Sequence, residues 1–300
     1  MKILNYGSCN VDYVYSLDHV LKVGETLVAD GMETFPGGKG LNQSVALARA
    51  GAPVFHAGCI GAGGEFLEAL LAEAGADLSY LTHTNEKNGH AVIQVSRAGE
   101  NSIFIYQGSN AMVTKADIDR TLADFSAGDV LLLQNEISNV GYLVAQAAAR
   151  GLFVVLNPSP IDDSLRAVDL SRVGCIVLNE IEAADLTGQS DPSAALDYFA
   201  AHYPDLLVVL TLGGEGCVCQ NKGERIVQPA FEADVVDTTA AGDTFTGYFV
   251  AGLYEGRPLS EILVLATAAA SIAVSRRGAA PPSPCAKRWN PASVGEDKRK

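Results

Sequence analysis

Residues 130–156 read VLLLQNEISNVGYLVAQAAARGLFVVL. Two apolar runs flank a segment with helical spacing, and the same alternation continues to residue 211. The predicted strands are 130–133, 152–156, 174–178 and 206–211, and the predicted helices lie near 139–150 and 180–188. Apolar strands that alternate with helices are typical of a parallel sheet with helices on both faces. The sequence therefore predicts an α/β fold.

The first hundred residues carry shorter segments in which apolar and polar residues alternate. These segments are 11–17, 26–35, 90–96 and 102–106. Half-buried strands of this kind predict a small second sheet, a lid over one edge of the main domain. We expect one domain over 1–284, with lid strands within 10–36 and 89–107, and a poorly ordered tail at 285–300.

Charge and hydropathy exclude several classes of partner. The net charge of -14 disfavours nucleic acid, which needs clustered Lys and Arg. The apolar runs are far shorter than the ~20 residues that span a bilayer, and the N-terminus reads as a strand rather than a secretory signal. We therefore expect a cytoplasmic protein without a membrane partner. Cys217 and Cys219 lack further ligands at metal-binding spacing, which predicts core packing for this pair.

Residues 236–249 read VDTTAAGDTFTGYF and precede a helix-like run. Small residues allow a ligand to approach the backbone, and a helix N-terminus offers unpaired N–H groups. This combination suits a transferring phosphoryl group. A carboxylate at this point, Asp243, can take a proton from an alcohol. For the single residue, an ordinary Asp at a helix start is the alternative.

Residues 35–51 read FPGGKGLNQSVALARAG, a glycine loop that leads into a helix. The loop can present Lys39 and Asn42 to a hydroxyl-rich ligand. A Walker A loop is excluded because its Gly-x-x-x-x-Gly-Lys-Ser/Thr pattern is missing here. A glycine turn with a solvated Lys is the alternative.

Three further polar residues are candidate sugar ligands. Asn10 and Asp12 are two apart in a strand and so point to one face, where they can bind neighbouring hydroxyls. Glu136 follows the strand 130–133 at a strand-to-helix junction, where α/β sheets place ligands. The alternatives are turn-forming residues and an acid in a helix first turn.

Together these segments resemble the ribokinase-like (PfkB) sugar kinases over residues 2–284. The resemblance implies a three-layer fold with a central, mostly parallel sheet, flanking helices and a small β-sheet lid. It assigns Ala240, Ala241 and Gly242 to an anion hole and Asp243 to the catalytic base. It also places six residues at the sugar site, namely Asn10, Asp12, Gly38, Lys39, Asn42 and Glu136.

The nucleotide side rests on the same resemblance. Residues 179–182, NEIE, are similar to the family's Asn-x-x-Glu element, in which Glu182 would act on Mg²⁺ through water. Acids in a helix first turn are the alternative. Residues 211–216, TLGGEG, resemble the nucleotide loop, and the helix 268–275 resembles the adenine pocket wall. The implied nucleotide-binding residues are Asn179, Thr211, Gly213, Gly216 and Thr267.

A monovalent cation and a dimer are also implied. Asp237 and the carbonyls of Thr239, Ala273 and Gly278 match the family's K⁺ ligands, while Pro282 stands where a serine ligand is usual. The lid offers a surface for a homodimer, as in ribokinases.

The predicted function is ATP-dependent phosphorylation of a primary sugar hydroxyl, with ATP, Mg²⁺ and K⁺ as cofactors. The set Asn10, Asp12, Asn42 and Glu136 resembles the family's ribose site, so D-ribose is the predicted substrate and ribose 5-phosphate the product. Fructose, adenosine and 2-keto-3-deoxygluconate remain alternatives, although a sugar acid would want an Arg in the pocket. A catalytically silent sugar-binding regulator is a further alternative, but it would need neither Asp243 nor a metal site.

Overall fold

The computed structural model describes residues 1–276, so the tail expected at 285–300 lies outside the described residues. The strands are β1 Ile3–Tyr6, β2 Asn10–Leu17, β3 Gly31–Gly37, β4 Val54–Ala62, β5 Asp77–Lys87, β6 His90–Ser96, β7 Asn101–Tyr106, β8 Val130–Gln134, β9 Phe153–Asn157, β10 Cys175–Asn179, β11 Leu207–Thr211, β12 Cys217–Asn221 and β13 Glu224–Gln228. The α-helices are α1 Lys39–Arg49, α2 Glu65–Ala74, α3 Lys115–Leu122, α4 Val140–Ala149, α5 Asp163–Arg166, α6 Glu180–Thr187, α7 Pro192–His202, α8 Ala241–Tyr254 and α9 Leu259–Val274. Three 3-10 helices are η1 Gly108–Met112, η2 Leu170–Arg172 and η3 Gly213–Glu215.

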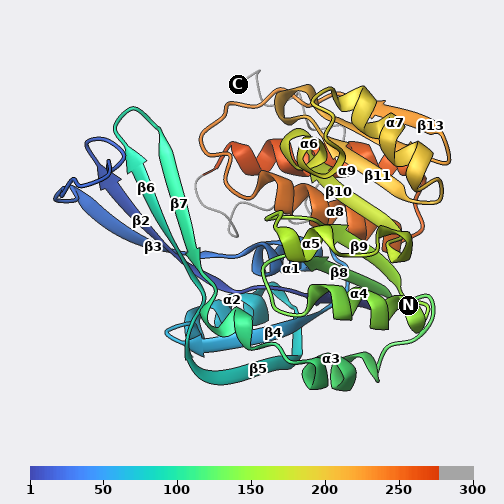
Figure 1. Cartoon of the computed structure of the whole chain (residues 1–300), viewed down its shortest axis with the longest axis horizontal. Helices are drawn as coiled ribbons and strands as arrows, with labels where there is room; N and C mark the ends of the chain where they lie inside the picture. The colour runs from blue at the N-terminus through green and yellow to red at the C-terminus, as the bar shows by residue number, and fades with distance from the viewer. Residues whose placement is uncertain (277–300) are drawn as a thin grey trace, which may run out of the picture.

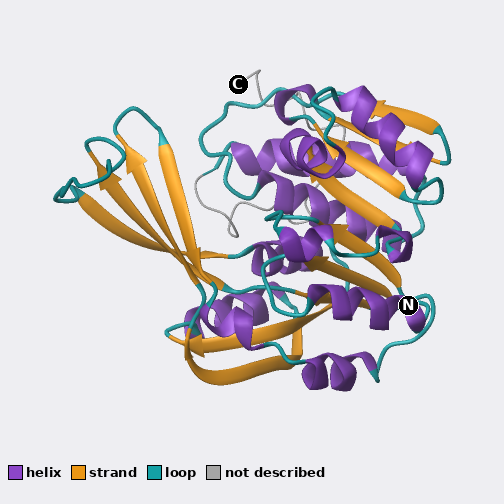
Figure 2. Ribbon diagram, viewed as in Figure 1, coloured by secondary structure: helices purple, strands orange, loops and turns teal. Residues whose placement is uncertain are grey.

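A nine-stranded sheet forms the centre of the molecule, in the order β13-β12-β11-β10-β9-β8-β1-β4-β5 (Figure 1). Neighbours from β11 to β5 run parallel, and β12 and β13 add antiparallel strands at one edge. Helices cover both faces of the sheet (Figure 2). The predicted α/β fold with a mostly parallel sheet is confirmed.

The continuous apolar runs of the central strands follow from burial on both faces. Along β8, Leu131 and Leu133 pack into a core with α3, α4, α6 and α7. Val130 and Leu132 point to the opposite face and pack with α1, α8 and α9. Because side chains alternate along a strand, each run must be apolar at every position to fill both layers.

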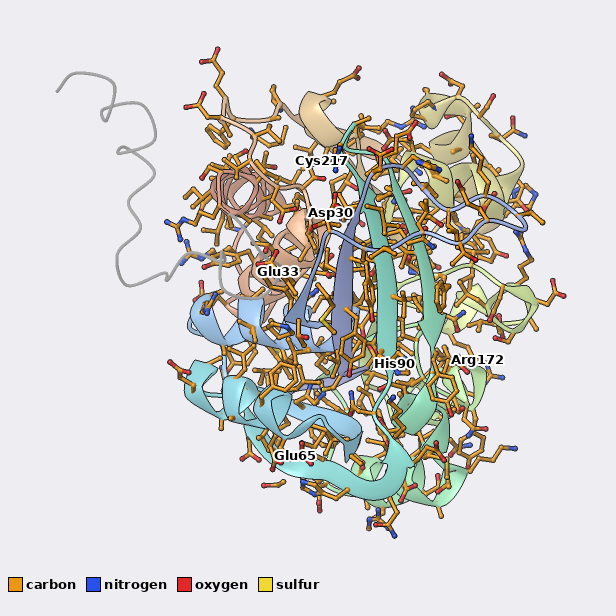
Figure 3. All side chains as sticks on the ribbon, turned by 90° about the vertical axis from the view of Figure 1, so that its left-hand side faces the viewer. Asp30, Glu33, Glu65, His90, Arg172 and Cys217 are labelled. Atoms are coloured by element: carbon orange, nitrogen blue, oxygen red, sulfur yellow. The ribbon has the colours of Figure 1, made fainter. Side chains whose placement is uncertain are left out.

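The second sheet, which we call the lid, has the strand order β3-β2-β6-β7. Its outer pairs are antiparallel, and β2 and β6 run parallel. The lid projects from the body of the molecule (Figure 1). Asp30 and Glu33 lie toward its free end and His90 lies at its base (Figure 3). The expected small sheet is therefore present.

One lid strand differs from its prediction. The alternation in 26–35 predicts a strand over that range, but β3 begins at Gly31 and ends at Gly37. The partner strand β2 ends at Leu17, and the ladder starts where Ser16 pairs with Gly31. The Asp30 amide still donates to the Ser16 carbonyl at 2.8 Å, but residues 26–29 lie beyond this pairing and form no strand of the lid.

The cysteines pack in the interior, as predicted for Cys217 and Cys219. All five cysteines in the described range are free and buried. Within residues 1–276, no helix combines the length and hydropathy that crossing a membrane requires.

Candidate active site

Four polar residues end neighbouring parallel strands. Gln134 ends β8, Asn157 ends β9, Asn179 ends β10 and Thr211 ends β11. The register pairs Gln134 with Asn157 and Asn179 with Thr211. These side chains therefore line the carboxyl edge of the sheet, where open α/β sheets bind ligands.

The two principal motifs meet at this edge. The Nδ2 of Asn42 donates to Oδ2 of Asp243 at 2.9 Å, although the two residues are 201 positions apart. The Nε2 of Gln43 donates to the other oxygen, Oδ1, also at 2.9 Å. Asp243 stands in the first turn of α8 and its side chain is 7% exposed. The predicted base is thus a buried carboxylate held by two side-chain amides.

The start of α8 has the geometry of an anion site. Ala240 is the N-cap and adopts a left-handed conformation, with φ of 57°. This conformation is uncommon for a residue with a Cβ, and such residues gather at functional sites. A Cβ added at Gly242 would meet no heavy atom within 4 Å, so a ligand has room to approach. The first-turn N–H groups of α8 lack partners within the helix and can bind phosphoryl oxygens.

Glu136 is fixed beneath the glycine loop. Its Oε2 accepts from the backbone N–H of Lys39 at 2.9 Å and from the Ser8 hydroxyl. Burial raises the pKa of Glu136. Burial acts to lower the pKa of Lys39, but the negative charges of Asp243, Glu136 and Glu182 outweigh it, and that pKa is raised. The ammonium group therefore stays charged at the centre of the site.

Asn10 has a fixed orientation. Its Oδ1 accepts from Nδ2 of Asn110 at 2.7 Å, which leaves the Asn10 NH₂ group to face a ligand. The loop packs closely here, since Gly38 has φ of 90° and a Cβ on it would lie 2.8 Å from the Asn10 nitrogen. Gly38 is therefore needed for close approach of the two segments.

Asp12 lies on β2, two residues after Asn10. Burial, together with the nearby charges of Glu136 and Asp243, raises its pKa to about 7. A Cβ on Gly37 would lie 2.1 Å from Oδ2 of Asp12, so this glycine makes room for the carboxyl. Asp12, Glu136 and Asp243 are thus close enough to interact, and three acids together suit several hydroxyl donors.

Two buried acceptors in the site are unsatisfied. Among buried side chains of residues 1–276, Asn42 Oδ1 and Gln134 Oε1 make no hydrogen bond. Buried polar atoms are nearly always paired, so a ligand is the natural partner for such an atom in a binding site. An acceptor such as Asn42 Oδ1 calls for a hydroxyl, as a sugar would provide.

Asn179 and Glu182 form a capping box at the start of α6. Asn179 Oδ1 accepts from the Glu182 amide at 2.8 Å, and Glu182 Oε2 accepts from the Asn179 amide at 3.0 Å. Both the helix-start alternative and a metal role are compatible with this geometry, because Oε1 is not used in the box. No group of three metal-binding side chains occurs within the described residues.

The nucleotide loop follows β11. Thr211 Oγ1 donates to the Leu178 carbonyl at 3.3 Å. Gly213 has φ of 52° and Gly216 φ of 103°, and a Cβ on Gly216 would lie 2.1 Å from the Gln228 carbonyl oxygen. Gly216 is therefore required by the chain's own packing, whereas Gly213 faces open space.

Thr267 lies beside the nucleotide loop, because Cys217, which its hydroxyl contacts, follows Gly216 and pairs with Thr211. It is 5% exposed, and its hydroxyl is 3.6 Å from Cys217 Sγ on β12. Its hydroxyl therefore faces the sheet.

The candidate cation ligands come from two segments. The amides of Val236 and Asp237 donate to the Val274 carbonyl, at 2.8 and 3.1 Å. The Asp237 carboxylate accepts from the Thr239 amide at 2.9 Å. The loop thus lies against the C-terminal end of α9, which includes Ala273 and carries the negative end of the helix dipole. Gly278 and Pro282 lie outside the described residues.

Comparison with known proteins identifies the family. A model described as pfkB family carbohydrate kinase matches residues 1–286. The chain belongs to this family. A ribokinase of Haemophilus influenzae is 37% identical over 285 residues, 91% of this chain and 92% of the relative.

Solved structures of the PfkB family agree with the fold of this kinase. Ribokinase of Arabidopsis thaliana, complexed with ribose and ATP, has a TM-score of 0.81 and 32% identity, and the match covers 95% of this chain and 96% of that one. Ribokinase of Cryptococcus neoformans var. grubii serotype A, in complex with ADP, has a TM-score of 0.82 and 32% identity, and covers 95% and 98%. The family predicted from the two motifs is confirmed, and the protein is a carbohydrate kinase.

The sequence interpretation missed the second layer of this PfkB kinase site. Gln43, Gln134 and Asn157 form hydrogen bonds beneath Asp243. Two of them could have been found, because a polar residue that closes a buried apolar strand usually lies at the ligand edge. For Gln43, a signal was its position between Asn42 and Ser44, a run of three polar residues in a helix whose following residues are apolar.

Proposed function

We propose that the protein transfers the γ-phosphoryl group of ATP to the primary hydroxyl of D-ribose and forms ribose 5-phosphate. The observation that carries this proposal is the hydrogen bond between Asn42 and Asp243. It joins the sugar loop to the first turn of α8, so an alcohol bound by the loop would lie beside both a base and an anion site. Relatives named ribokinase favour ribose among the possible sugars.

The sugar would be held by polar groups of the lid, of α1 and of the segment after β8. Asp12 and Glu136 offer carboxylate acceptors, Asn10 offers an NH₂ group, and Asn42 Oδ1 offers an unsatisfied acceptor. A few polar groups placed in this way can orient neighbouring hydroxyls of a small sugar. The lid would close over the sugar and exclude the water that would otherwise hydrolyse ATP.

Asp243 would then accept the proton from O5 as that oxygen bonds to the γ-phosphorus. The bond between the γ-phosphorus and its bridging oxygen breaks, and ADP leaves with the electron pair. The amides at the start of α8 would stabilise the negative charge that spreads over the equatorial oxygens. Lys39, whose charge is secured by three acids, would neutralise charge from the opposite side.

Magnesium fits the donors on the nucleotide side. Mg²⁺ prefers oxygen ligands, keeps several waters and often binds through one carboxylate and substrate phosphates. Glu182 supplies such a carboxylate beside the capping box. When bound, the ion would supply positive charge that stabilises the phosphate groups.

A monovalent cation fits the loop at Asp237. The carboxylate of Asp237 and the carbonyl of Thr239 lie against the carboxyl end of α9. Carbonyl oxygens and one carboxylate suit K⁺, which would stabilise the left-handed turn that builds the anion site.

We further propose a homodimer that forms through the lid of a cytoplasmic enzyme. On β7, four consecutive large apolar or aromatic side chains are exposed, Ile103, Phe104, Ile105 and Tyr106. An exposed patch of this kind on an edge strand favours association with a second copy.

The test is ADP release from ATP and Mg²⁺, with and without K⁺, across ribose, deoxyribose, fructose, adenosine and 2-keto-3-deoxygluconate. Ribose-dependent release that is lost in Asp243→Asn would support the proposal. Release with another alcohol, again lost in the variant, would keep the mechanism and replace the substrate. Binding of sugars without any release would favour a regulator.

A further inference from the structure

We propose that Gln43 is a positioning residue that sets the direction of the Asp243 carboxylate, through a chain of buried amides that ends on two backbone carbonyls. The proposal rests on the proposed function, in which Asp243 is the base. Gln43 itself would touch neither sugar nor nucleotide.

Gln43 holds one oxygen of the base. Its Nε2 donates to Asp243 Oδ1 at 2.9 Å, while Asn42 occupies Oδ2. Gln43 is fully buried, at 0% exposure, and it lies on α1 with its side chain beneath the carboxylate. With both oxygens held, the carboxylate plane cannot rotate, and each oxygen keeps one lone-pair direction for a substrate hydroxyl.

One end of the amide chain is fixed at β10. Asn157 Nδ2 donates to the Val177 carbonyl at 2.9 Å. A carbonyl only accepts, so Asn157 must turn its Oδ1 toward Gln43, where it accepts from Nε2 at 3.1 Å. Gln43 must therefore present its NH₂ group to both Asn157 and Asp243.

The other end is fixed at α1. Asn5 Nδ2 donates to the Gly40 carbonyl at 2.8 Å, which turns Asn5 Oδ1 toward Gln134. Gln134 Nε2 donates to that oxygen at 3.1 Å and to Gln43 Oε1 at 2.6 Å. The Gln43 oxygen is therefore occupied. The flipped orientation of the Gln43 amide, in which its oxygen would face Asp243, is excluded by the hydrogen bonds at both ends of the amide chain.

The network beneath the base thus fixes both ends of the Gln43 amide, and Gln134 Oε1 is the one amide oxygen of the chain from Asn5 to Asn157 that has no partner. A flipped Gln43 would place an acceptor against the carboxylate and turn it away from the hydroxyl. Small displacements of a reacting group are enough to cost about 10²-fold in rate, because the reacting atoms must stay near contact distance. Gln43 would thus act on kcat, and sugar binding would depend on it little.

The test is Gln43→Met, which keeps the length of the side chain and removes both hydrogen-bonding groups. We expect the rate of phosphoryl transfer in a single turnover to fall on the order of 10- to 100-fold, with the KM for ribose within about threefold of wild type. In an Asp243→Asn background the same change should cost less than about twofold, because there is no base to position.

Gln220→Met is the matched control. Gln220 is also buried, at 3% exposure, and also uses both ends, since Nε2 donates to the Leu196 carbonyl and Oε1 accepts from Arg225. It lies on β12, away from the base. We expect a similar loss of thermal stability with an unchanged rate. If Gln43→Met does not fold, Gln134→Met removes the partner that orients Gln43 and should slow transfer in the same direction.

Two results would overturn the proposal: an unchanged transfer rate in the folded Gln43→Met or Gln134→Met variant, or an equal loss in the Asp243→Asn background. If wild type phosphorylates a different alcohol, the proposed substrate fails and the same cycle is run with that alcohol. If wild type transfers the phosphoryl group to no alcohol, crystal structures of the variants test the inference instead. The Asp243 carboxylate should be rotated in Gln43→Met and unmoved in Gln220→Met, and an unmoved carboxylate in both would contradict the inference.

Discussion

At the scale of single residues, the site contains buried carboxyl groups whose surroundings differ. Asp243 is buried and receives two amide hydrogen bonds, whereas Asp12 is buried with the charges of two other acids nearby. Burial and neighbouring like charges raise the pKa of Asp12. The two acids therefore have different environments.

The first prediction concerns the base. Asp243→Asn keeps the shape of the side chain and removes its ability to accept a proton. We expect kcat to fall by at least about 10²-fold, and the KM for ribose to change little, because general-base catalysis contributes on this scale. A coupled assay of ADP release measures both constants. A kcat within tenfold of wild type would contradict the role of Asp243.

The second prediction concerns Asp12 and pH. Burial raises the pKa of Asp12 in the folded protein to about 7, from the ordinary value of 3.8 for an Asp carboxyl. The folded state therefore binds the proton more tightly, and this contribution to stability is lost as pH rises toward 7. The free energy of unfolding of wild type should fall by about 1.4 kcal/mol per pH unit below the pKa of Asp12. Asp12→Asn lacks this loss, so its free energy of unfolding relative to wild type should rise by roughly 2 kcal/mol between pH 5.5 and pH 8.5.

Urea unfolding at the two pH values measures this difference. Asp205→Asn, at an exposed position in the turn before β11, is the control and should show the same change with pH as wild type. A constant gap between Asp12→Asn and wild type across the pH range would show that the carboxyl does not titrate there.

At the scale of elements, two helix starts lie at the carboxyl edge of the sheet. The helix α8 begins at a left-handed alanine, and α6 begins at a capping box. The first N–H groups of a helix have no partner within it, and at α6 one of them, on Glu182, is bound by the Asn179 side chain. Local backbone geometry is therefore as important here as the side chains.

The third prediction tests the left-handed turn. Ala240→Gly should stabilise the protein by up to about 1 kcal/mol, since glycine adopts positive φ without steric cost. The neighbouring Ala241 is the first residue of α8 and has helical backbone angles, so Ala241→Gly should destabilise the protein by up to about 0.5 kcal/mol. Thermal or urea unfolding of both variants gives the sign. Opposite signs support the assigned turn, and destabilisation by both would contradict it.

The fourth prediction separates the capping role of Glu182 from a metal role. Glu182→Gln keeps an oxygen that can accept from the Asn179 amide, so the capping box and the stability should persist. The loss of charge should raise the Mg²⁺ concentration needed for half-maximal activity several-fold. Asn179→Ala, in contrast, should cost about 1 kcal/mol of stability. An unchanged Mg²⁺ requirement in Glu182→Gln would leave only the capping role.

At the scale of the whole molecule, the lid is a single sheet that projects from a three-layer body (Figure 1). A sheet exposed on both faces keeps apolar side chains in water unless a ligand or a second chain covers them. The sugar would cover part of the face that carries Asp12. A second lid would cover the exposed side chains of β7.

The fifth prediction tests this association. Phe104 is 57% exposed on β7, and Phe104→Lys should convert a dimer of the 31.4 kDa chain into a monomer. The control is Val227→Lys, at a residue 66% exposed on β13 of the body, which should leave the dimer intact. Light scattering coupled to gel filtration measures the mass. A monomeric wild type would contradict the dimer.

The sequence by itself determined the α/β class and the main motifs. Apolar runs such as 130–133 must be buried on both faces, and this requirement leaves a helix-covered parallel sheet as the solution. The order of small residues and an acid in 236–243 likewise predicted the family, because a phosphate-binding turn needs small residues in sequence.

Only the tertiary structure decided the contacts between distant segments. The pairing of Asn42 with Asp243, the amide chain from Asn5 to Asn157, and the start of β3 at Gly31 depend on which strands and helices become neighbours. Local pattern fixes the face on which a side chain lies but not its partner, since hydrogen bonds form across elements that the chain brings together only on folding. For this reason Gln43 escaped the sequence interpretation although it adjoins a predicted site residue.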